Sequence, residues 1–175
     1  NEIRVSLVGS EMCIRDMHGG APSFAAAEHT WALMLAAMRD IPAQMASLRS
    51  GDWQMGVGKS VHGRRIGIYG YGRIGKQVAR YAEAFGMDVV WWASEEGRAR
   101  AAADGQRVAE SREAFFSTSD VVTLHVRLKP STMGLITADD LALMGPGSVL
   151  VNTSRAGLIA PGALKAALDA GRPGQ

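Results

Sequence analysis

Residues 65–75 read Arg-Ile-Gly-Ile-Tyr-Gly-Tyr-Gly-Arg-Ile-Gly, a short apolar run that leads directly into three spaced glycines. The run from Ile66 to Tyr69 is typical of a strand buried in a parallel sheet. Apolar residues at helical spacing follow the glycines, and a second apolar run begins at Asp88. A strand, a glycine turn, a helix and a second strand form the setting in which a dinucleotide-binding turn occurs.

The three glycines, Gly70, Gly72 and Gly75, each have a distinct role in such a turn. Gly70 allows the tight bend, Gly72 lets a pyrophosphate approach the backbone, and Gly75 lets the helix pack close to the strand. The free N–H groups at the helix start, at the positive end of its dipole, then hold the phosphates. A glycine turn with a purely structural role is the alternative. The complete strand, turn, helix and strand setting favours a dinucleotide site over it.

Composition excludes several classes of protein. The 175 residues suit one domain, and a chain with 47% hydrophobic and 21% charged residues is globular rather than disordered. A net charge of +2 is too small to indicate a nucleic-acid partner or an acidic membrane surface. The four histidines are far apart in the sequence, and no cluster has metal-ligand spacing. We therefore expect no metal, no nucleic acid and no membrane partner.

Other features bear on location. The single cysteine, Cys13, rules out an internal disulfide framework and favours a reducing compartment. The most apolar stretch, residues 23–38, is shorter than the roughly 18 residues that indicate a membrane span, and it carries Glu28 and His29. The chain opens with Asn-Glu-Ile-Arg rather than with a basic segment followed by an apolar one, so we expect no signal peptide. These features favour a cytoplasmic protein.

Strands and helices alternate along the chain. Strands are expected at 66–69, 88–93, 107–109, 121–125 and 148–152, of which the third is weak. Helices are expected after the glycine turn and at 24–39, 42–50, 97–104, 111–117, 138–144 and 161–170. This order predicts an α/β fold with a doubly wound parallel sheet. A six-stranded dinucleotide fold would need one more strand after residue 175, so we expect the last strand to be absent. Within the chain, Trp53 is expected to pack as an anchor in the connection after 42–50, and His29 is expected to be a core residue of the helix at 24–39.

One cation stands out at the predicted carboxyl edge of the sheet, where ligands bind in open α/β folds. Arg155 closely follows the buried strand at 148–152. A guanidinium in that position clamps a carboxylate and polarises a carbonyl. A solvated loop arginine is an equally good interpretation of position alone.

Six motifs, in order and spacing, resemble the NAD-binding domain of the D-isomer-specific 2-hydroxyacid dehydrogenases. The resemblance covers about residues 20–175 and implies a Rossmann-type sheet that lacks its last strand and nearly all of the substrate domain. The six motifs are Ala-Glu-His-Thr-Trp-Ala-Leu (27–33), Gly-Tyr-Gly-Arg-Ile-Gly (70–75), Ala-Phe-Gly-Met (84–87), Ser-Asp-Val-Val-Thr-Leu-His (119–125), Pro-Ser-Thr-Met-Gly-Leu-Ile (130–136) and Val-Asn-Thr-Ser-Arg (151–155).

The resemblance implies a set of site residues. Arg155 would bind the substrate carboxylate and carbonyl, as the catalytic residue present in this chain. The family's acid/base histidine and its glutamate partner lie downstream of the arginine, so this fragment is expected to be inactive. His125 matches a different histidine and is interpreted as structural and cofactor-side. The expected cofactor-binding residues are Gly70, Tyr71, Gly72, Arg73, Ile74, Gly75, Ser94, Val126, Arg127, Thr132, Thr153 and Ser154.

Two positions depart from the family pattern. The ribose-binding acid expected after the second strand falls at Ala93, and it is absent. Ser94 and the two glutamates that follow it are within reach of the ribose hydroxyls, whereas Ser94 with Arg98 is suited to a 2′-phosphate. The cofactor is therefore NAD or NADP. The second departure is Arg127, where most members have proline.

The expected function of the intact protein is hydride transfer between a nicotinamide cofactor and a 2-hydroxy or 2-keto acid. The family usually dimerises through this domain, so we expect a homodimer with the apolar helix at 24–39 buried in the contact. The alternative is an NAD(H)-sensing binding module of the corepressor type on the same fold. A related NAD enzyme such as formate dehydrogenase is a third possibility.

The N-terminal flank is treated separately from the domain. Residues 1–19 are interpreted as a flank and residues 20–175 as the dinucleotide-binding domain. The first 16 residues match nothing in the family and resemble a translated sequencing adapter, which makes a non-native origin one interpretation. A native strand at 3–8 is the other.

Overall fold

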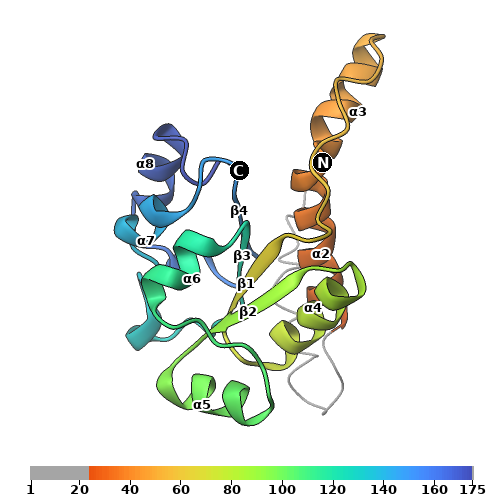
Figure 1. Cartoon of the computed structure of the whole chain (residues 1–175). Helices are drawn as coiled ribbons and strands as arrows, with labels where there is room; N and C mark the ends of the chain where they lie inside the picture. The colour runs from red at the N-terminus through yellow and green to blue at the C-terminus, as the bar shows by residue number, and fades with distance from the viewer. Residues whose placement is uncertain (1–23, 175) are drawn as a thin grey trace, which may run out of the picture.

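Four parallel strands form the centre of the computed structural model, which describes residues 24–174 (Figure 1). Expectations for the first 19 residues lie outside this range. The strands are β1 (Arg65–Tyr69), β2 (Asp88–Trp92), β3 (Val121–Leu124) and β4 (Val149–Asn152), in the order β2-β1-β3-β4. The order reverses between β1 and β3, as expected for a doubly wound sheet of the Rossmann type.

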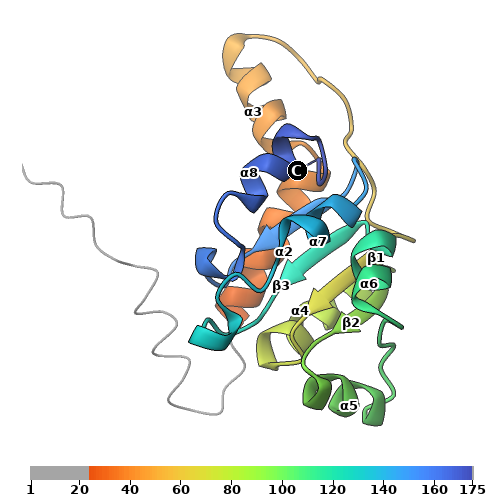
Figure 2. The ribbon, with the colours of Figure 1, turned by 90° about the vertical axis from the view of Figure 1, so that its left-hand side faces the viewer.

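Helices cover both faces of the sheet (Figures 1 and 2). Helices α2 (Phe24–Met38) and α4 (Arg73–Ala84) lie on one face. Helices α6 (Arg112–Thr118), α7 (Ala138–Leu143) and α8 (Ala163–Asp169) lie on the other. Helix α5 (Glu95–Ala103) follows β2, and α3 (Ile41–Ser50) extends away from the sheet. Two short 3-10 turns, η1 (Pro130–Thr132) and η2 (Ala156–Leu158), complete the chain.

Alternation along each strand divides the core into two halves. In β1, Ile66 and Ile68 pack toward α2 and α4, whereas Tyr69 packs with Phe115 and Phe116 toward α6. Each strand residue sends its side chain to the face opposite that of its neighbour. Both faces are buried, which explains why the strands read as continuous apolar runs.

The predicted strand at 107–109 is wrong. Val108 forms only an isolated bridge with Trp91: Trp91 N–H donates to Arg107 O, and Ala109 N–H donates to Trp91 O. Val108 is the one large apolar side chain of these three residues, which offers too little to bury for a full strand. The other four predicted strands are confirmed within about one residue.

Capping explains two shifted helix ends. Helix α5 begins two residues earlier than expected because the Ser94 hydroxyl caps it, accepting from Gly97 N–H at 3.3 Å. Helix α8 begins at Ala163 rather than Pro161, since Gly162 adopts a left-handed conformation as its N-cap.

Three side-chain expectations need correction. Trp53 was expected to pack as an anchor, but it is 80% exposed. His29 was expected in the core and lies at the surface. Helix α2 buries one side, including Trp31, against the domain, whereas Leu33 on its other side is 43% exposed. The segment from α2 to β1 therefore presents more apolar surface than its composition suggested.

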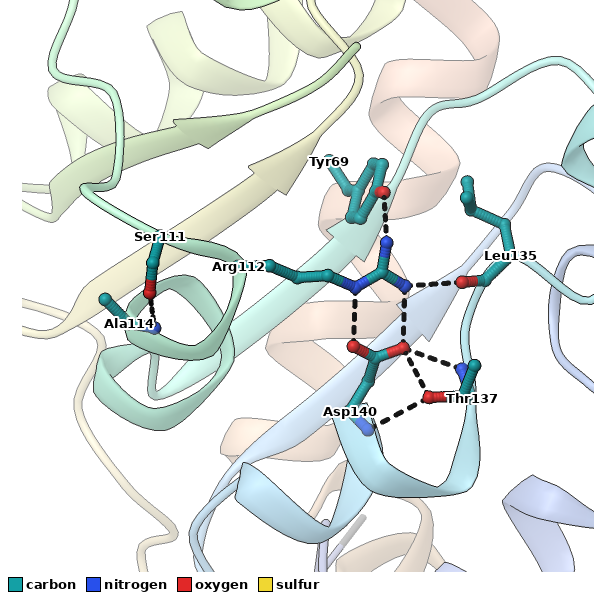
Figure 3. A network of polar contacts seen from close by, with 7 residues as sticks. All are labelled: Tyr69, Ser111, Arg112, Ala114, Leu135, Thr137 and Asp140. Atoms are coloured by element: carbon teal, nitrogen blue, oxygen red, sulfur yellow. Dashed lines mark hydrogen bonds and ion pairs between the residues drawn. The ribbon is translucent and has the colours of Figure 1, made fainter. Parts of the chain in front are cut away.

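A partly buried ion pair, Arg112 with Asp140, ties the second face to β1 (Figure 3). Arg112 Nε and Nη2 donate to the two carboxylate oxygens of Asp140 at 2.6 and 2.7 Å, and Nη1 donates to the Tyr69 hydroxyl at 3.1 Å. Burial opposes the charge on Asp140, but the Arg112 guanidinium and the donors of Thr137 outweigh it and hold the pKa of Asp140 below its usual value. This network fixes the end of β1 directly before the glycine turn.

Candidate cofactor site

The glycine turn is held between the ends of two neighbouring strands. Gly70 N–H donates to Trp92 O at 2.7 Å, and His125 N–H donates to Tyr69 O at 2.8 Å. Gly70 has a φ of 112°, and a Cβ there would lie 2.5 Å from His125 O. Only glycine fits this position, as the motif predicted.

The start of α4 is open to a ligand. Gly72 is the N-cap and no side chain caps the helix. A Cβ on Gly72 would meet nothing within 4 Å. The N–H groups of Arg73, Ile74 and Gly75 belong to the first turn, which has no intrahelical acceptors. An uncapped helix start with open space before it suits the pyrophosphate of a dinucleotide.

Tyr71 faces away from this opening. Its ring packs edge-on against Trp91 with centroids 4.7 Å apart, and its hydroxyl donates to Asp104. Burial, followed by the Asp104 carboxylate, raises the pKa of Tyr71. Tyr71 was predicted to bind the cofactor, and only its backbone is available at the turn.

The loop after β3 lines the same edge. Val126 packs on the turn, since its Cγ2 would lie 3.3 Å from a Cβ on Gly70. The Thr132 hydroxyl donates to Arg127 O at 2.8 Å and accepts from Lys129 N–H at 2.8 Å. Thr132 therefore shapes the loop, while the Arg127 side chain is exposed.

His125 is not suited to proton transfer at neutral pH. Its Nε2 lies 3.0 Å from the Thr123 hydroxyl, and burial lowers its pKa to about 4. The ring is neutral at pH 7, which fits the structural role expected for it.

The loop after β4 carries the remaining site residues. Ser154 Oγ donates to Leu124 O at 2.8 Å, which ties the loop to the end of β3. The Asn152 amide accepts from Ser154 N–H at 3.1 Å and donates to Arg155 O at 3.0 Å. Thr153 Oγ1 lies 2.7 Å from Thr30 Oγ1 on α2. Thr30 supports this loop from α2, and no pattern in the sequence distinguishes it.

Arg155 has a charge available for a ligand. Its side chain is exposed, and Nη1 donates to Ser154 O at 2.8 Å. Within residues 24–174, no carboxylate forms an ion pair with Arg155. The structure thus brings Arg155, the glycine turn and the loop after β3 to one edge of the sheet.

The described residues form neither a metal-binding cluster nor a membrane-spanning helix. Between residues 24 and 174, no three His, Cys, Asp or Glu side chains are grouped to hold a metal ion. No helix in this part of the chain is long and apolar enough to cross a membrane.

Comparison with known proteins identifies the domain. Residues 31–175 match the family model for the D-isomer specific 2-hydroxyacid dehydrogenase, NAD binding domain. The chain belongs to this family. It is an NAD-binding domain of the family's oxidoreductases, as the six motifs implied.

Sequence relatives agree with this assignment. The chain is 38% identical over 154 residues to a D-3-phosphoglycerate dehydrogenase of Methanocaldococcus jannaschii, covering 87% of this chain and 29% of that protein. It is 40% identical over 148 residues to the enzyme of the same name from Mycobacterium tuberculosis, covering 83% and 28%. The chain therefore spans less than a third of the curated relatives it matches.

Solved structures share the fold. A phosphoglycerate oxidoreductase from Vibrio cholerae superposes with a TM-score of 0.82 at 41% identity, covering 87% of this chain and 49% of that one. A glyoxylate reductase from Paecilomyes thermophila gives 0.74 at 34% identity, covering 85% and 45%. All four relatives named here are oxidoreductases, and the alternative of a corepressor-type sensing module has no support among them.

Proposed function

We propose that the intact protein transfers hydride between a nicotinamide cofactor and a small 2-hydroxy or 2-keto acid, with this chain holding the cofactor. The observation that carries the proposal is the shared edge: the uncapped start of α4 and the unpaired Arg155 both lie at the carboxyl ends of the strands. When bound, the nicotinamide ring supplies the hydride acceptor or donor.

The cofactor would lie along the loops that the chain provides. The N–H groups after Gly72 bind the pyrophosphate, and Gly72 leaves it room, while Gly70 makes the tight bend and Gly75 lets α4 pack close to β1. Ser94 lies toward the adenosine half. Val126, Arg127 and Thr132 shape the loop beside the turn, and Thr153 and Ser154 lie toward the nicotinamide half. This direction follows from the strand order, because a dinucleotide crosses the sheet at the point where the order reverses.

Arg155 would orient the acid. Its guanidinium offers parallel N–H donors that suit a carboxylate, and a further donor polarises the adjacent carbonyl. Asn152 and Ser154 fix the backbone on which Arg155 stands. This chemistry recognises the carboxylate and carbonyl that all 2-hydroxy and 2-keto acids share. Selectivity for the side chain of the acid would come from the rest of the protein.

We propose that the 175-residue chain alone has no dehydrogenase turnover. The substrate oxygen needs a proton donor and acceptor whose pKa lies near the working pH. The histidine that directly follows β3, His125, has a pKa lowered by burial to about 4. Residues 20–175 then act as the dinucleotide-binding domain, with residues 1–19 as a flank.

We also propose a cytoplasmic homodimer. The single cysteine of the sequence supports a reducing compartment. Helix α3 and the segment that returns from it extend away from the sheet (Figures 1 and 2). Monomeric proteins rarely expose a large contiguous apolar surface. The large apolar side chains exposed on α3 and on this returning segment are Ile41, Met45, Leu48, Trp53, Met55 and Val57, and Leu33 is exposed on α2.

Binding and turnover test the proposal separately. Calorimetric titration of the chain with NADH is expected to show one site per chain. The chain alone is then assayed for NADH oxidation with glyoxylate, pyruvate and hydroxypyruvate, and no turnover is expected. Absence of NADH binding would contradict the cofactor site. Turnover that depends on Arg155 would show that an acid/base group lies within this chain.

A further inference from the structure

We propose that Asp104 is a positioning residue for the cofactor, because its carboxylate anchors both Tyr71 and Lys76 and thereby fixes the part of the glycine turn that would hold the pyrophosphate. The inference rests on the proposed cofactor site and adds to it a residue from outside the glycine motif. Asp104 is the C-cap of α5 and lies 33 residues beyond Tyr71 in the chain.

The outer part of the glycine turn depends on one side chain for its attachment to the domain. Gly70 is fixed to the sheet by its main-chain bond to Trp92 O. Beyond it, Gly72 N–H bonds locally to Gly70 O at 3.0 Å, and a Cβ on Gly72 would meet nothing within 4 Å. The Arg73 side chain is exposed, whereas that of Tyr71 is 7% exposed. The Tyr71 side chain therefore connects this part of the turn to the body of the domain.

The Tyr71 ring is held by packing and by one strong hydrogen bond. It lies edge-on to the Trp91 ring with centroids 4.7 Å apart, and Lys76 Nζ lies 4.2 Å from its centroid. The Tyr71 hydroxyl donates to Asp104 Oδ2 at 2.5 Å. Packing alone lets an aromatic ring tilt, whereas a charge-assisted hydrogen bond adds a fixed point at the far end of the side chain.

Lys76 forms a second connection to the same oxygen. It lies in the first turn of α4, where its N–H donates to Gly72 O at 3.0 Å. Its Nζ donates to Asp104 Oδ2 at 2.8 Å. The Lys76 ammonium, followed by the Tyr71 hydroxyl, holds the pKa of Asp104 below its usual value, so the carboxylate is charged at pH 7. One carboxylate oxygen thus anchors the residue before Gly72 and the helical turn after it.

The anchor point is itself tied to the sheet. Asp104 N–H donates to Arg100 O at 3.0 Å at the end of α5. Two residues further on, the Gln106 side chain accepts from Trp91 Nε1 at 3.1 Å. Trp91 belongs to β2 and carries the face on which the Tyr71 ring packs. Asp104 therefore connects the turn to a segment that β2 holds in place.

Charge and exposure separate a positioning role from the alternatives. The Lys76 and Asp104 side chains are 47% and 51% exposed, and ion pairs at this exposure contribute little to stability. Removing a negative charge from the protein favours an anionic ligand on electrostatic grounds alone. Loss of Asp104 should therefore strengthen dinucleotide binding if only charge counts, and weaken it if the carboxylate positions the turn.

Calorimetry with NADH on the full chain tests the role. Asp104→Ala should weaken NADH binding by about three- to tenfold, because the turn loses a hydrogen bond to a charged group. Asp104→Asn keeps an acceptor oxygen and should fall between Asp104→Ala and the wild type. Tyr71→Phe keeps the ring and loses the hydroxyl, and it should weaken binding as well. The midpoint of urea unfolding should stay nearly unchanged in all three variants.

A double variant and a charge-matched control complete the experiment. Tyr71→Phe combined with Asp104→Ala should bind NADH no more weakly than Asp104→Ala alone, since both changes remove the same contact. Asp169→Asn removes the carboxylate of an exposed ion pair with Lys165 and should leave NADH affinity unchanged. Amide hydrogen exchange in the absence of NADH should be faster at residues 72–75 in Asp104→Ala and not in Asp169→Asn.

Each contrary result has a distinct meaning. NADH affinity in Asp104→Ala equal to or above that of the wild type would overturn the positioning role and leave the cofactor site standing. Additive losses in the double variant would overturn the shared contact with Tyr71. Failure of the wild type to bind NADH would overturn the proposed function itself.

Discussion

The hydroxyls of Thr30 and Thr153 lie 2.7 Å apart, although 123 residues separate them in the chain. Thr30 stands on α2 and is 1% exposed, while Thr153 directly follows β4. The Thr30 hydroxyl also donates to Ala26 O at 2.8 Å. A hydroxyl has one proton, so both contacts are satisfied only when Thr153 donates to Thr30. Thr153 then offers only lone pairs to a ligand.

Loss of the Thr30 hydroxyl should loosen the loop that carries Arg155. We expect Thr30→Val to lower the free energy of unfolding by about 1–2 kcal/mol, the cost of an unpaired buried donor or acceptor. NADH affinity should fall as well. Urea unfolding and NADH calorimetry measure the two effects. Thr30→Ser keeps the hydroxyl and is the matched control. Equal NADH affinity in the wild type and both variants would show that the Thr30–Thr153 contact does not affect cofactor binding.

A side chain at position 72 should abolish cofactor binding without unfolding the domain. Gly72 has a φ of −120°, which any residue adopts, and a Cβ there would meet nothing. Gly72→Val should keep the unfolding free energy within about 0.5 kcal/mol, as for other surface changes. NADH binding should be lost in calorimetry. Gly70→Ala is the contrasting variant, since its Cβ would meet His125 O and destabilise the turn.

Stability should fall in acid partly because of His125. Burial lowers the pKa of His125 from 6.5 to about 4. Between these values the unfolded chain binds a proton that the folded chain does not, so stability falls as the pH decreases from 6.5 to 4. At about 1.4 kcal/mol per pKa unit, this contribution is on the order of 3 kcal/mol. Urea unfolding across this range should show a shallower pH dependence in His125→Gln, and an identical slope would assign the effect to other groups.

The Arg112–Asp140 pair should be costly to break from one side. The Asp140 side chain is 8% exposed, so Arg112→Leu leaves a buried carboxylate without its guanidinium. We expect a loss of about 3 kcal/mol in unfolding free energy. The double variant Arg112→Leu with Asp140→Leu should recover part of that loss. If the double variant is no more stable than the single variant, the loss does not come from an uncompensated charge on Asp140.

Charges placed on α3 should separate the proposed dimer. Met45 and Leu48 are 47% and 54% exposed, so substitution does not disturb the core. Met45→Glu with Leu48→Glu should convert a dimer to a monomer in light scattering. Leu168→Glu on α8, at 45% exposure, is the control and should remain dimeric. A wild type that is monomeric at micromolar concentration would contradict the proposal.

Local pattern sufficed for the elements that position the site. The run at β1, the glycines and the apolar spacing of α4 are all encoded within 20 consecutive residues, and the structure confirms them. Local pattern was not sufficient for residues 107–109. Their backbone pairs with Trp91 at a single position, which depends on the geometry of β2 as well as on their own sequence.

Long-range polar pairs were beyond the sequence. Nothing about Thr30 distinguishes it from other polar residues on an apolar helix, and its partner is decided by how α2 crosses β4. From the sequence alone Arg112 is indistinguishable from a surface arginine, because its partner Asp140 lies on α7, 28 residues further along the chain. Exposure of Trp53 was also missed, since an aromatic residue in a connection is as easily buried as left in solvent.

The main-chain clamp on the glycine turn has a thermodynamic consequence. Because Gly70 bonds to the end of β2 and Tyr69 to the start of the β3 loop, the cradle is as rigid as the sheet itself. Binding into a preorganised cradle forfeits little conformational entropy. The domain should therefore bind a dinucleotide without a large change in the conformation of the glycine turn. Exposed residues around the turn can then differ between related proteins without altering the turn itself.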